Sequence, residues 1–140
     1  AATQVFNRCD AAVLAAAVAD YRPVEVAEQK IKKSGDEMQV SLVRNPDIAA
    51  SIGQSKAPHQ KLVGFALETQ NGLENAQSKL ERKNLDLIVL NSLTDRGAGF
   101  NHDTNKITIL DRGNKKREFE LKTKAAVAVD IVDALQELWG

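Results

Sequence analysis

Five lysines are the residues of this 140-residue sequence best suited to chemistry on an anion. Three lie close together, at Lys30, Lys32 and Lys33, and two more are four residues apart, at Lys79 and Lys83. An ammonium group on a flexible stem suits a mobile polyphosphate. Residues four apart share one helical face, where like charges repel each other unless they are solvated or face an anion. The lysines therefore indicate a phosphate site, with a solvated surface as the alternative.

The elements that would position these lysines begin with three apolar runs, each ending in a polar residue. Residues 11–19 end at Asp20, residues 61–68 at Glu68, and residues 85–91 at Asn91. Continuous apolar runs are typical of strands buried on both faces of a parallel sheet. Ligands of such sheets bind beyond the carboxyl ends of the strands. We therefore expect an open α/β sheet with a site along one edge, with a buried helix as the alternative for the first run alone.

Helices are expected between and after these strands. Asn45 followed by Pro46 predicts the start of a short helix running from Asp47 to about Gly53, because Asn caps free backbone N–H groups and Pro suits the first turn. Such a helix start is also a receptor for an anion or a base edge. Apolar residues recur at helical spacing over residues 72–83 and 126–138, and Thr123 is a cap for the final helix.

The remaining segments predict turns, an arm and a hairpin. Residues 38–43 alternate apolar and polar side chains after a turn signal, so we expect residues 30–44 to project as a two-stranded arm. Residues 92–104 have the composition of a loop. Residues 106–110 and 117–121 flank a turn sequence that predicts a β-hairpin. No linker divides the chain, which is expected to form a single domain over residues 1–140.

Composition excludes several classes of function. Nineteen basic and nineteen acidic residues give a formal net charge of zero, so no general attraction to nucleic acid or membrane is expected. The single cysteine, Cys9, permits no internal disulfide, which fits the cytoplasm. His59 and His102 lie in predicted loops without a nucleophile nearby, and the sequence contains neither GxGxxG nor a P-loop. The chain lacks an initiator Met and soon enters a strand that we expect to be central, which indicates a piece of a longer domain.

Six motifs occur in one order along the chain: AVADYRP (17–23), KIKK (30–33), NPDI (45–48), VGFALET (63–69), KNLDLIVLN (83–91) and GFN (99–101). Together they closely resemble bacterial phosphopantothenoylcysteine synthetase, the synthetase half of the bifunctional coenzyme A biosynthesis flavoprotein. The resemblance covers essentially the whole chain but only the later part of that family's domain. The opening Gly-rich segment and the Ser-Asn motif after it have no counterpart here, and Leu67 replaces a residue that is commonly small.

The resemblance implies an open, mostly parallel Rossmann-like sheet with helices on both faces, a dimerisation arm, and a C-terminal hairpin and helix. It implies a cytoplasmic ligase that joins 4'-phosphopantothenate and L-cysteine through an acyl-cytidylate, using CTP and Mg²⁺. It also implies a homodimer, with higher oligomers possible through a fused decarboxylase domain, and gives no metal ligands. The implied roles are Lys30 in catalysis, Asp20 as a nucleotide-site acid, Asn45, Pro46, Asp47 and Ile48 around the cytosine, Phe65 beside the nucleotide, and Lys79 and Lys83 on the triphosphate.

Two other functions fit the sequence. One is a non-catalytic module that binds CTP and dimerises, because the family's first segment is missing. The other is a Rossmann-type NAD-dependent dehydrogenase whose glycine fingerprint lies outside this chain. Pyrophosphate release would distinguish the ligase from the module, and protection by nicotinamide nucleotides would favour the dehydrogenase.

Overall fold

A computed structural model describes residues 1–32, 35–68, 71–92 and 102–140, with the exception of the Ser92 side chain. Predictions that involve Lys33, Thr69 or the segment Gly99-Phe100-Asn101 lie outside the described residues. The chain forms two compact units. The larger unit consists of residues 1–15 and 48–140, and the smaller unit consists of residues 16–47.

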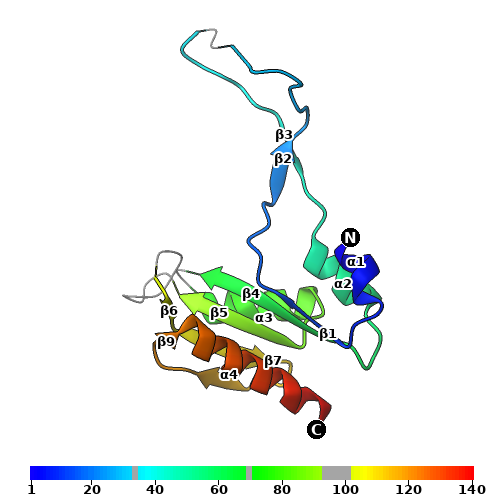
Figure 1. Cartoon of the computed structure of the whole chain (residues 1–140), viewed down its shortest axis with the longest axis vertical. Coiled ribbons are helices and arrows are strands. Elements are labelled where there is room, and N and C mark those ends of the chain that lie inside the picture. Colours follow the sequence, from blue (N-terminus) through cyan, green and yellow to red (C-terminus); the bar gives the residue numbers. More distant parts are fainter. Residues whose placement is uncertain (33–34, 69–70, 93–101) are drawn as a thin grey trace. The chain divides into compact units, whose positions relative to one another are not determined.

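A five-stranded sheet forms the centre of the larger unit (Figure 1). Its strands, in spatial order, are β1 (Ala11–Leu14), β4 (Lys61–Glu68), β5 (Leu87–Ser92), β7 (Ile107–Asp111) and β8 (Lys116–Glu118). The first three strands are parallel, and β7 and β8 continue the sheet in antiparallel pairing. This mixed α/β architecture confirms the predicted fold class, including the hairpin.

Two further strands lie beside the C-terminal helix. β6 (Thr104–Asn105) pairs antiparallel with β9 (Lys122–Thr123), so the predicted loop over residues 92–104 ends in a short strand. The pairing places Thr123 at the start of the last helix. There its hydroxyl oxygen accepts a hydrogen bond from the Ala126 N–H at 3.2 Å, which confirms the predicted cap.

Helices cover both faces of the sheet (Figure 1). On one face lie α1 (Ala2–Phe6), α2 (Ile48–Ser55) and α3 (Gly72–Arg82), and on the other lies α4 (Lys124–Gln136), followed by the 3-10 turn η1 (Glu137–Trp139). Because side chains alternate along a strand, Leu62 packs into the first layer and Val63 into the second. The sheet therefore separates two apolar cores, as expected for strands buried on both faces.

The first strand differs from the prediction. It ends at Leu14 instead of Ala19, and the Val18 N–H donates to the Ala16 carbonyl at 3.0 Å, a tight turn that takes the backbone out of the sheet. β1 is also an edge strand of the described sheet and not a central one, and Val13 is exposed. The preceding helix α1 was not predicted from the sequence.

Two other elements also differ in their boundaries. Helix α2 begins at Ile48, so Asn45 does not cap it, and α2 continues beyond Gly53 to Ser55. Strand β5 begins at Leu87 instead of Leu85, because the Leu85 N–H donates to the Leu80 carbonyl at the end of α3. The backbone therefore still closes the helix where the sequence predicted a strand.

The smaller unit contains one short antiparallel pair of strands. β2 (Tyr21–Pro23) pairs with β3 (Leu42–Arg44), whereas residues 38–41 form no strand. The two-stranded ladder is therefore shorter than the arm predicted over residues 30–44 and uses residues from before it. Met38, Val40 and Leu42 are exposed. A two-stranded pair alone is only marginally stable in water.

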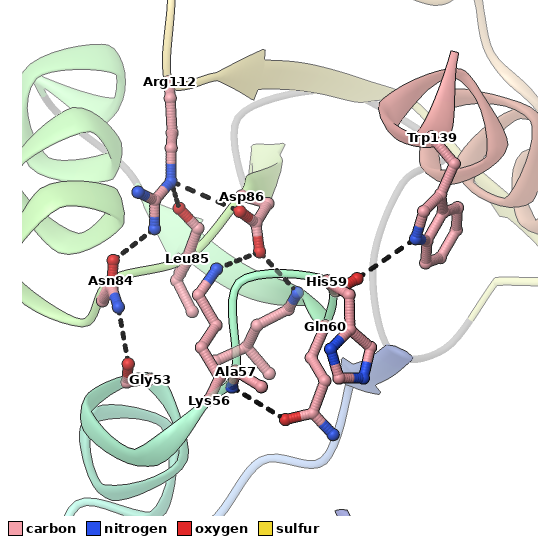
Figure 2. A network of polar contacts seen from close by, with 11 residues as sticks. Gly53, Lys56, Ala57, His59, Gln60, Asn84, Leu85, Asp86, Arg112 and Trp139 are labelled. Atoms are coloured by element: carbon pink, nitrogen blue, oxygen red, sulfur yellow. Dashed lines mark hydrogen bonds and ion pairs between the residues drawn. The ribbon is translucent and has the colours of Figure 1, made fainter. Parts of the chain in front are cut away.

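A buried polar network ties together the amino-terminal ends of β4 and β5 (Figure 2). The carboxylate of Asp86 accepts hydrogen bonds from the Lys56 ammonium and, at 2.7 Å, from the Leu62 N–H, and Arg112 Nε lies 3.4 Å from it. The side chains of Lys56 and Asp86 are 8% and 12% exposed. The pKa of Lys56 lies below its ordinary value: burial, the largest cause, lowers it, the hydrogen bond and charge of Asp86 raise it, and the charges of Arg112 and Lys61 lower it.

Arg112 extends this network. It donates to the Leu85 carbonyl at 2.7 Å and to the Asn84 side chain, whose amide in turn donates to the Gly53 carbonyl at 2.6 Å (Figure 2). A side chain is excluded at Gly53, because an added Cβ would lie 1.9 Å from the Lys83 carbonyl oxygen.

Among the described residues, no helix is long and apolar enough to cross a membrane.

Candidate functional site

A cluster of polar side chains lies at the carboxyl end of β4, the edge where ligands bind in parallel sheets. Glu68 is the last residue of this strand. One of its carboxylate oxygens accepts a hydrogen bond from the Lys79 ammonium at 2.6 Å, and the other accepts one from the Asn75 amide at 3.0 Å. The Glu68 side chain is 14% exposed and the Lys79 side chain 34% exposed. Lys79 is therefore the more exposed partner of this ion pair.

Helix α3 brings these groups together through its periodicity. Ala76 and Leu80 are buried against the sheet, so Asn75 and Lys79, which are also four residues apart, share a neighbouring face. Gly72 lets the helix begin close to the strand, because a Cβ at this position would lie 3.2 Å from the Cβ of Glu68. The distance from Glu68 to its two donors is thus set by the packing of α3.

The Glu68 carboxyl responds to this environment. The hydrogen bond from Lys79 holds the pKa of Glu68 below its ordinary value, burial raises it, and the Asn75 hydrogen bond and the Lys79 charge lower it further. Because the pKa is lower in the folded state, the pair contributes stability above the ordinary carboxyl pKa. That contribution is lost as the pH falls through the lowered pKa.

We predict that Lys79→Met raises the pKa of Glu68 to its ordinary value or above, since the largest lowering cause is removed while burial remains. An NMR titration of the Glu68 side-chain carboxyl measures this shift. Arg82→Met is the matched control, because Arg82 is an exposed cation on the same helix. Equal carboxyl titrations in the wild type and the Lys79 variant would contradict the role assigned to the ion pair.

The other predicted residues of the larger unit do not join this cluster. Phe65 packs against the α4 side of the sheet, opposite the face that carries α3. Lys83 is the C-cap residue of α3, one position beyond its last helical residue. The Asn91 side-chain oxygen is buried without a hydrogen-bond partner among the described residues. Ile48 is the exposed first residue of α2.

In the smaller unit, Asn45 is the centre of a hydrogen-bonded group. Its backbone N–H donates to the Asp20 carbonyl at 2.8 Å, and its side-chain amide donates to the Ala19 carbonyl at 2.7 Å. Arg22 donates to the Asn45 side-chain oxygen at 2.9 Å. Lys30 is exposed, as are Asp20, Lys32, Pro46 and Asp47. Asn45 thus joins the two ends of this unit instead of capping a helix.

The sequence shows a family relationship. The model of the DNA/pantothenate metabolism flavoprotein C-terminal domain matches residues 1–138. The chain belongs to this family. It is 46% identical over 134 residues to the coenzyme A biosynthesis bifunctional protein CoaBC of Haemophilus influenzae, covering 96% of this chain and 32% of that protein. The resemblance found in the sequence is therefore confirmed.

A second relative has a different name. A protein from an unknown prokaryotic organism, called cysteine/cysteine sulfinic acid decarboxylase, is 55% identical over 132 residues, which cover 94% of this chain and 37% of the relative. The chain thus spans about a third of the length of these curated relatives.

Solved structures agree with the fold. The C-terminal domain of CoaBC has a TM-score of 0.76 and 33% identity, covering 97% of this chain and 58% of that one. A Cab2 mutant in complex with phosphopantothenate-cysteine has a TM-score of 0.66 at 21% identity, covering 90% and 44%. This second likeness concerns the fold alone.

The site residues that sequence reasoning missed are partners of residues that it found. Glu68 was recognised only as a polar strand end, and Asn75 and Arg22 were not considered. The four-residue spacing of Asn75 and Lys79 was a usable signal, because it places both donors on the helix that follows Glu68. The contact of Arg22 with Asn45 spans 23 positions and had no comparable local signal.

Proposed function

We propose that this family member is part of a CTP-dependent ligase that joins 4'-phosphopantothenate and L-cysteine in coenzyme A biosynthesis. The observation that carries the proposal is the match to the family model over residues 1–138, together with the identity to CoaBC. The six ordered motifs of the sequence support the same reaction.

The proposed reaction has two balanced steps. A carboxylate oxygen of 4'-phosphopantothenate attacks the α-phosphorus of CTP, so that an acyl-cytidylate forms and pyrophosphate leaves. The amine of cysteine then attacks the acyl carbon, forms the amide, loses a proton and releases CMP. In both steps the protein acts by holding reactants in position and by stabilising negative charge on phosphate.

We assign the residues of this chain to those tasks. Lys30 stabilises charge at the reacting phosphate, and Lys79 and Lys83 contact the triphosphate, since lysine supplies a mobile positive charge. Asp20 is the acid of the nucleotide site and Phe65 lies beside the nucleotide. The segment around the cytosine is Asn45, Pro46, Asp47 and Ile48.

Magnesium fits this proposal as a companion of the nucleotide. Among the described residues, no three His, Cys, Asp or Glu side chains gather into a metal site. Mg²⁺ is typically held by one or two carboxylates together with phosphate oxygens and water, so a lone exposed acid such as Asp20 suffices beside a triphosphate. When bound, the metal would neutralise phosphate charge.

The test is pyrophosphate release by the intact protein that contains this sequence, with CTP, 4'-phosphopantothenate and L-cysteine supplied together. We expect release that depends on all three compounds. The same assay on this chain alone separates the ligase from the alternative, a CTP-binding and dimerisation fragment without catalysis. No release by the intact protein would contradict the proposed reaction.

The relative named as a decarboxylase favours a second candidate function. Its 55% identity suggests that the intact protein removes CO₂ from cysteine or cysteine sulfinic acid. Release of CO₂ from L-cysteine without CTP would support this candidate. Release of pyrophosphate that requires 4'-phosphopantothenate would support the ligase.

We predict that CTP protects the intact protein from thermal unfolding more strongly than ATP does. The Asn45 segment is fixed by three hydrogen bonds and is assigned to the cytosine, so a purine would leave polar groups unpaired. At a hundredfold excess over its dissociation constant, a ligand adds about 2.7 kcal/mol of stability. Equal melting shifts with CTP and ATP at matched magnesium would contradict the preference.

We also propose a homodimer formed through the arm at residues 30–44, and predict that Val40→Asp with Leu42→Asp gives monomers. The arm exposes apolar side chains and has little backbone pairing. Burial against a second copy would therefore stabilise it. Sedimentation velocity measures the change, and Val129→Asp on the exposed side of α4 is the matched control. An unmodified protein that stays monomeric at high concentration would exclude this dimer.

A further inference from the structure

We propose that Glu68 is a positioning residue that holds the Lys79 ammonium in place for the triphosphate of the nucleotide. This inference rests on the proposed function and adds to it a residue that the sequence placed at the end of a strand without giving it a role. It follows from how the carboxylate, the lysine and the helix are arranged at the carboxyl end of β4.

The carboxylate is fixed before any ligand arrives. Both of its oxygens accept a hydrogen bond, one from Lys79 and one from Asn75, and both donors come from α3. The backbone of Glu68 is paired in the sheet opposite Ser92 of β5. Gly72 lets α3 begin next to the strand, because a Cβ added at this position would lie 3.2 Å from the Glu68 Cβ. Glu68 is therefore an acceptor held by two donors from the same helix.

The lysine remains able to bind an anion while it contacts Glu68. An ammonium group carries three N–H donors, and the hydrogen bond to Glu68 occupies one of them. The Lys79 side chain is 34% exposed, compared with 14% for Glu68. The acid is thus the more buried partner of the pair, and the lysine is the partner more accessible to a ligand.

The Lys56–Asp86 pair shows what a purely structural ion pair looks like in the same fold. There the lysine side chain is 8% exposed, and the carboxylate also accepts a hydrogen bond from the Leu62 N–H. The surrounding chain therefore shields the pair from solvent. It lies at the amino-terminal ends of the strands, away from the edge where ligands of α/β sheets bind. The Glu68–Lys79 pair differs in both respects.

The test is a double-mutant cycle in the intact protein, with Glu68→Gln, Lys79→Met and both together. Pyrophosphate release is measured against the concentration of CTP and, separately, of L-cysteine. We expect Glu68→Gln to lower kcat/KM for CTP roughly tenfold, the lower end of the effect of losing an orienting partner. The KM for L-cysteine should stay unchanged. The double variant should be no worse than Lys79→Met alone, because Glu68 acts through Lys79.

Glu74→Gln is the matched control, since Glu74 is an exposed acid on the same helix, and its kcat/KM should equal that of the wild type. The inference would be overturned if the losses in kcat/KM of the two single variants multiplied in the double variant. A Glu68→Gln variant that melts at a lower temperature but keeps its kcat/KM for CTP would also overturn it. A wild-type protein that releases no pyrophosphate with CTP would instead overturn the proposed function, and the inference would fall with it.

Discussion

Asp86→Ala is expected to lower the free energy of unfolding of the chain by about 3–5 kcal/mol, the cost of removing one partner from a buried ion pair. The substitution leaves the ammonium of Lys56, whose side chain is 8% exposed, without its counter-charge, and leaves the Leu62 N–H without an acceptor. Burial is the largest influence on the pKa of Lys56 and lowers it, whereas Asp86 raises it. Without the carboxylate, the lysine must therefore lose its proton or expose itself to water.

Urea unfolding of the variant and the wild type measures this loss, which should appear as a lower midpoint with an unchanged slope. Asp86→Asn is a second variant that keeps an acceptor for the Leu62 N–H, and it should lose less stability than Asp86→Ala. Glu118→Ala is the matched control, because it breaks an exposed ion pair with Lys116 and should leave the midpoint unchanged. If Asp86→Ala, like Glu118→Ala, left the urea midpoint unchanged, the network would not hold the strands together.

The elements that were predicted correctly are those whose signals are local. The strand over residues 61–68 has its predicted bounds, because its continuous apolar run is buried between two layers of helices. Helix α3 follows from the spacing of Leu73, Ala76 and Leu80, and α4 follows from its Thr123 cap. Each of these signals lies within the element itself.

The predictions that failed depended on hydrogen bonds that residue type does not reveal. Asn45 has the right residue type for a helix cap, but its side chain bonds Ala19 and Arg22, more than 20 positions away. Leu85 has the apolar character of a strand residue, but the end of α3 uses its N–H. At Asn45 a tertiary hydrogen bond outweighs a local preference, and at Leu85 a helix-end hydrogen bond does so. Residue type alone reveals neither.

The candidate site shows the same division. The sequence placed polar residues at strand ends and lysines on a helix, and the structure adds that Glu68 and Lys79 form a pair. Pairing could not be deduced from the sequence, because it depends on the close approach that Gly72 allows between α3 and β4. From the lysine spacing we predicted either a phosphate site or a solvated surface, and the structure adds a carboxylate of the chain itself beside Lys79.

The catalytic prediction concerns Lys30, and Lys30→Gln in the intact protein is expected to abolish acyl-cytidylate formation while leaving the fold intact. Lys30 is exposed and contributes nothing to either apolar core, so its loss should not shift the melting temperature. Its ammonium is proposed to stabilise negative charge that develops on the reacting phosphate. Removal of one such group typically costs about 3–4 kcal/mol of barrier, which corresponds to a 10²–10³-fold lower rate.

Single-turnover pyrophosphate release with CTP and 4'-phosphopantothenate, without cysteine, isolates this first step. Lys32→Gln is the matched control. Lys32 is also exposed and lies two residues after Lys30, so this substitution removes the same charge from a neighbouring position. If Lys30 acts at the reacting phosphate, only the Lys30 variant fails to release pyrophosphate in this step, because stabilisation of a transition state requires a group at a defined position. If the lysines act only through their general positive charge, the rate of pyrophosphate release falls by the same modest factor in both variants. Both losses then become smaller together as salt is added.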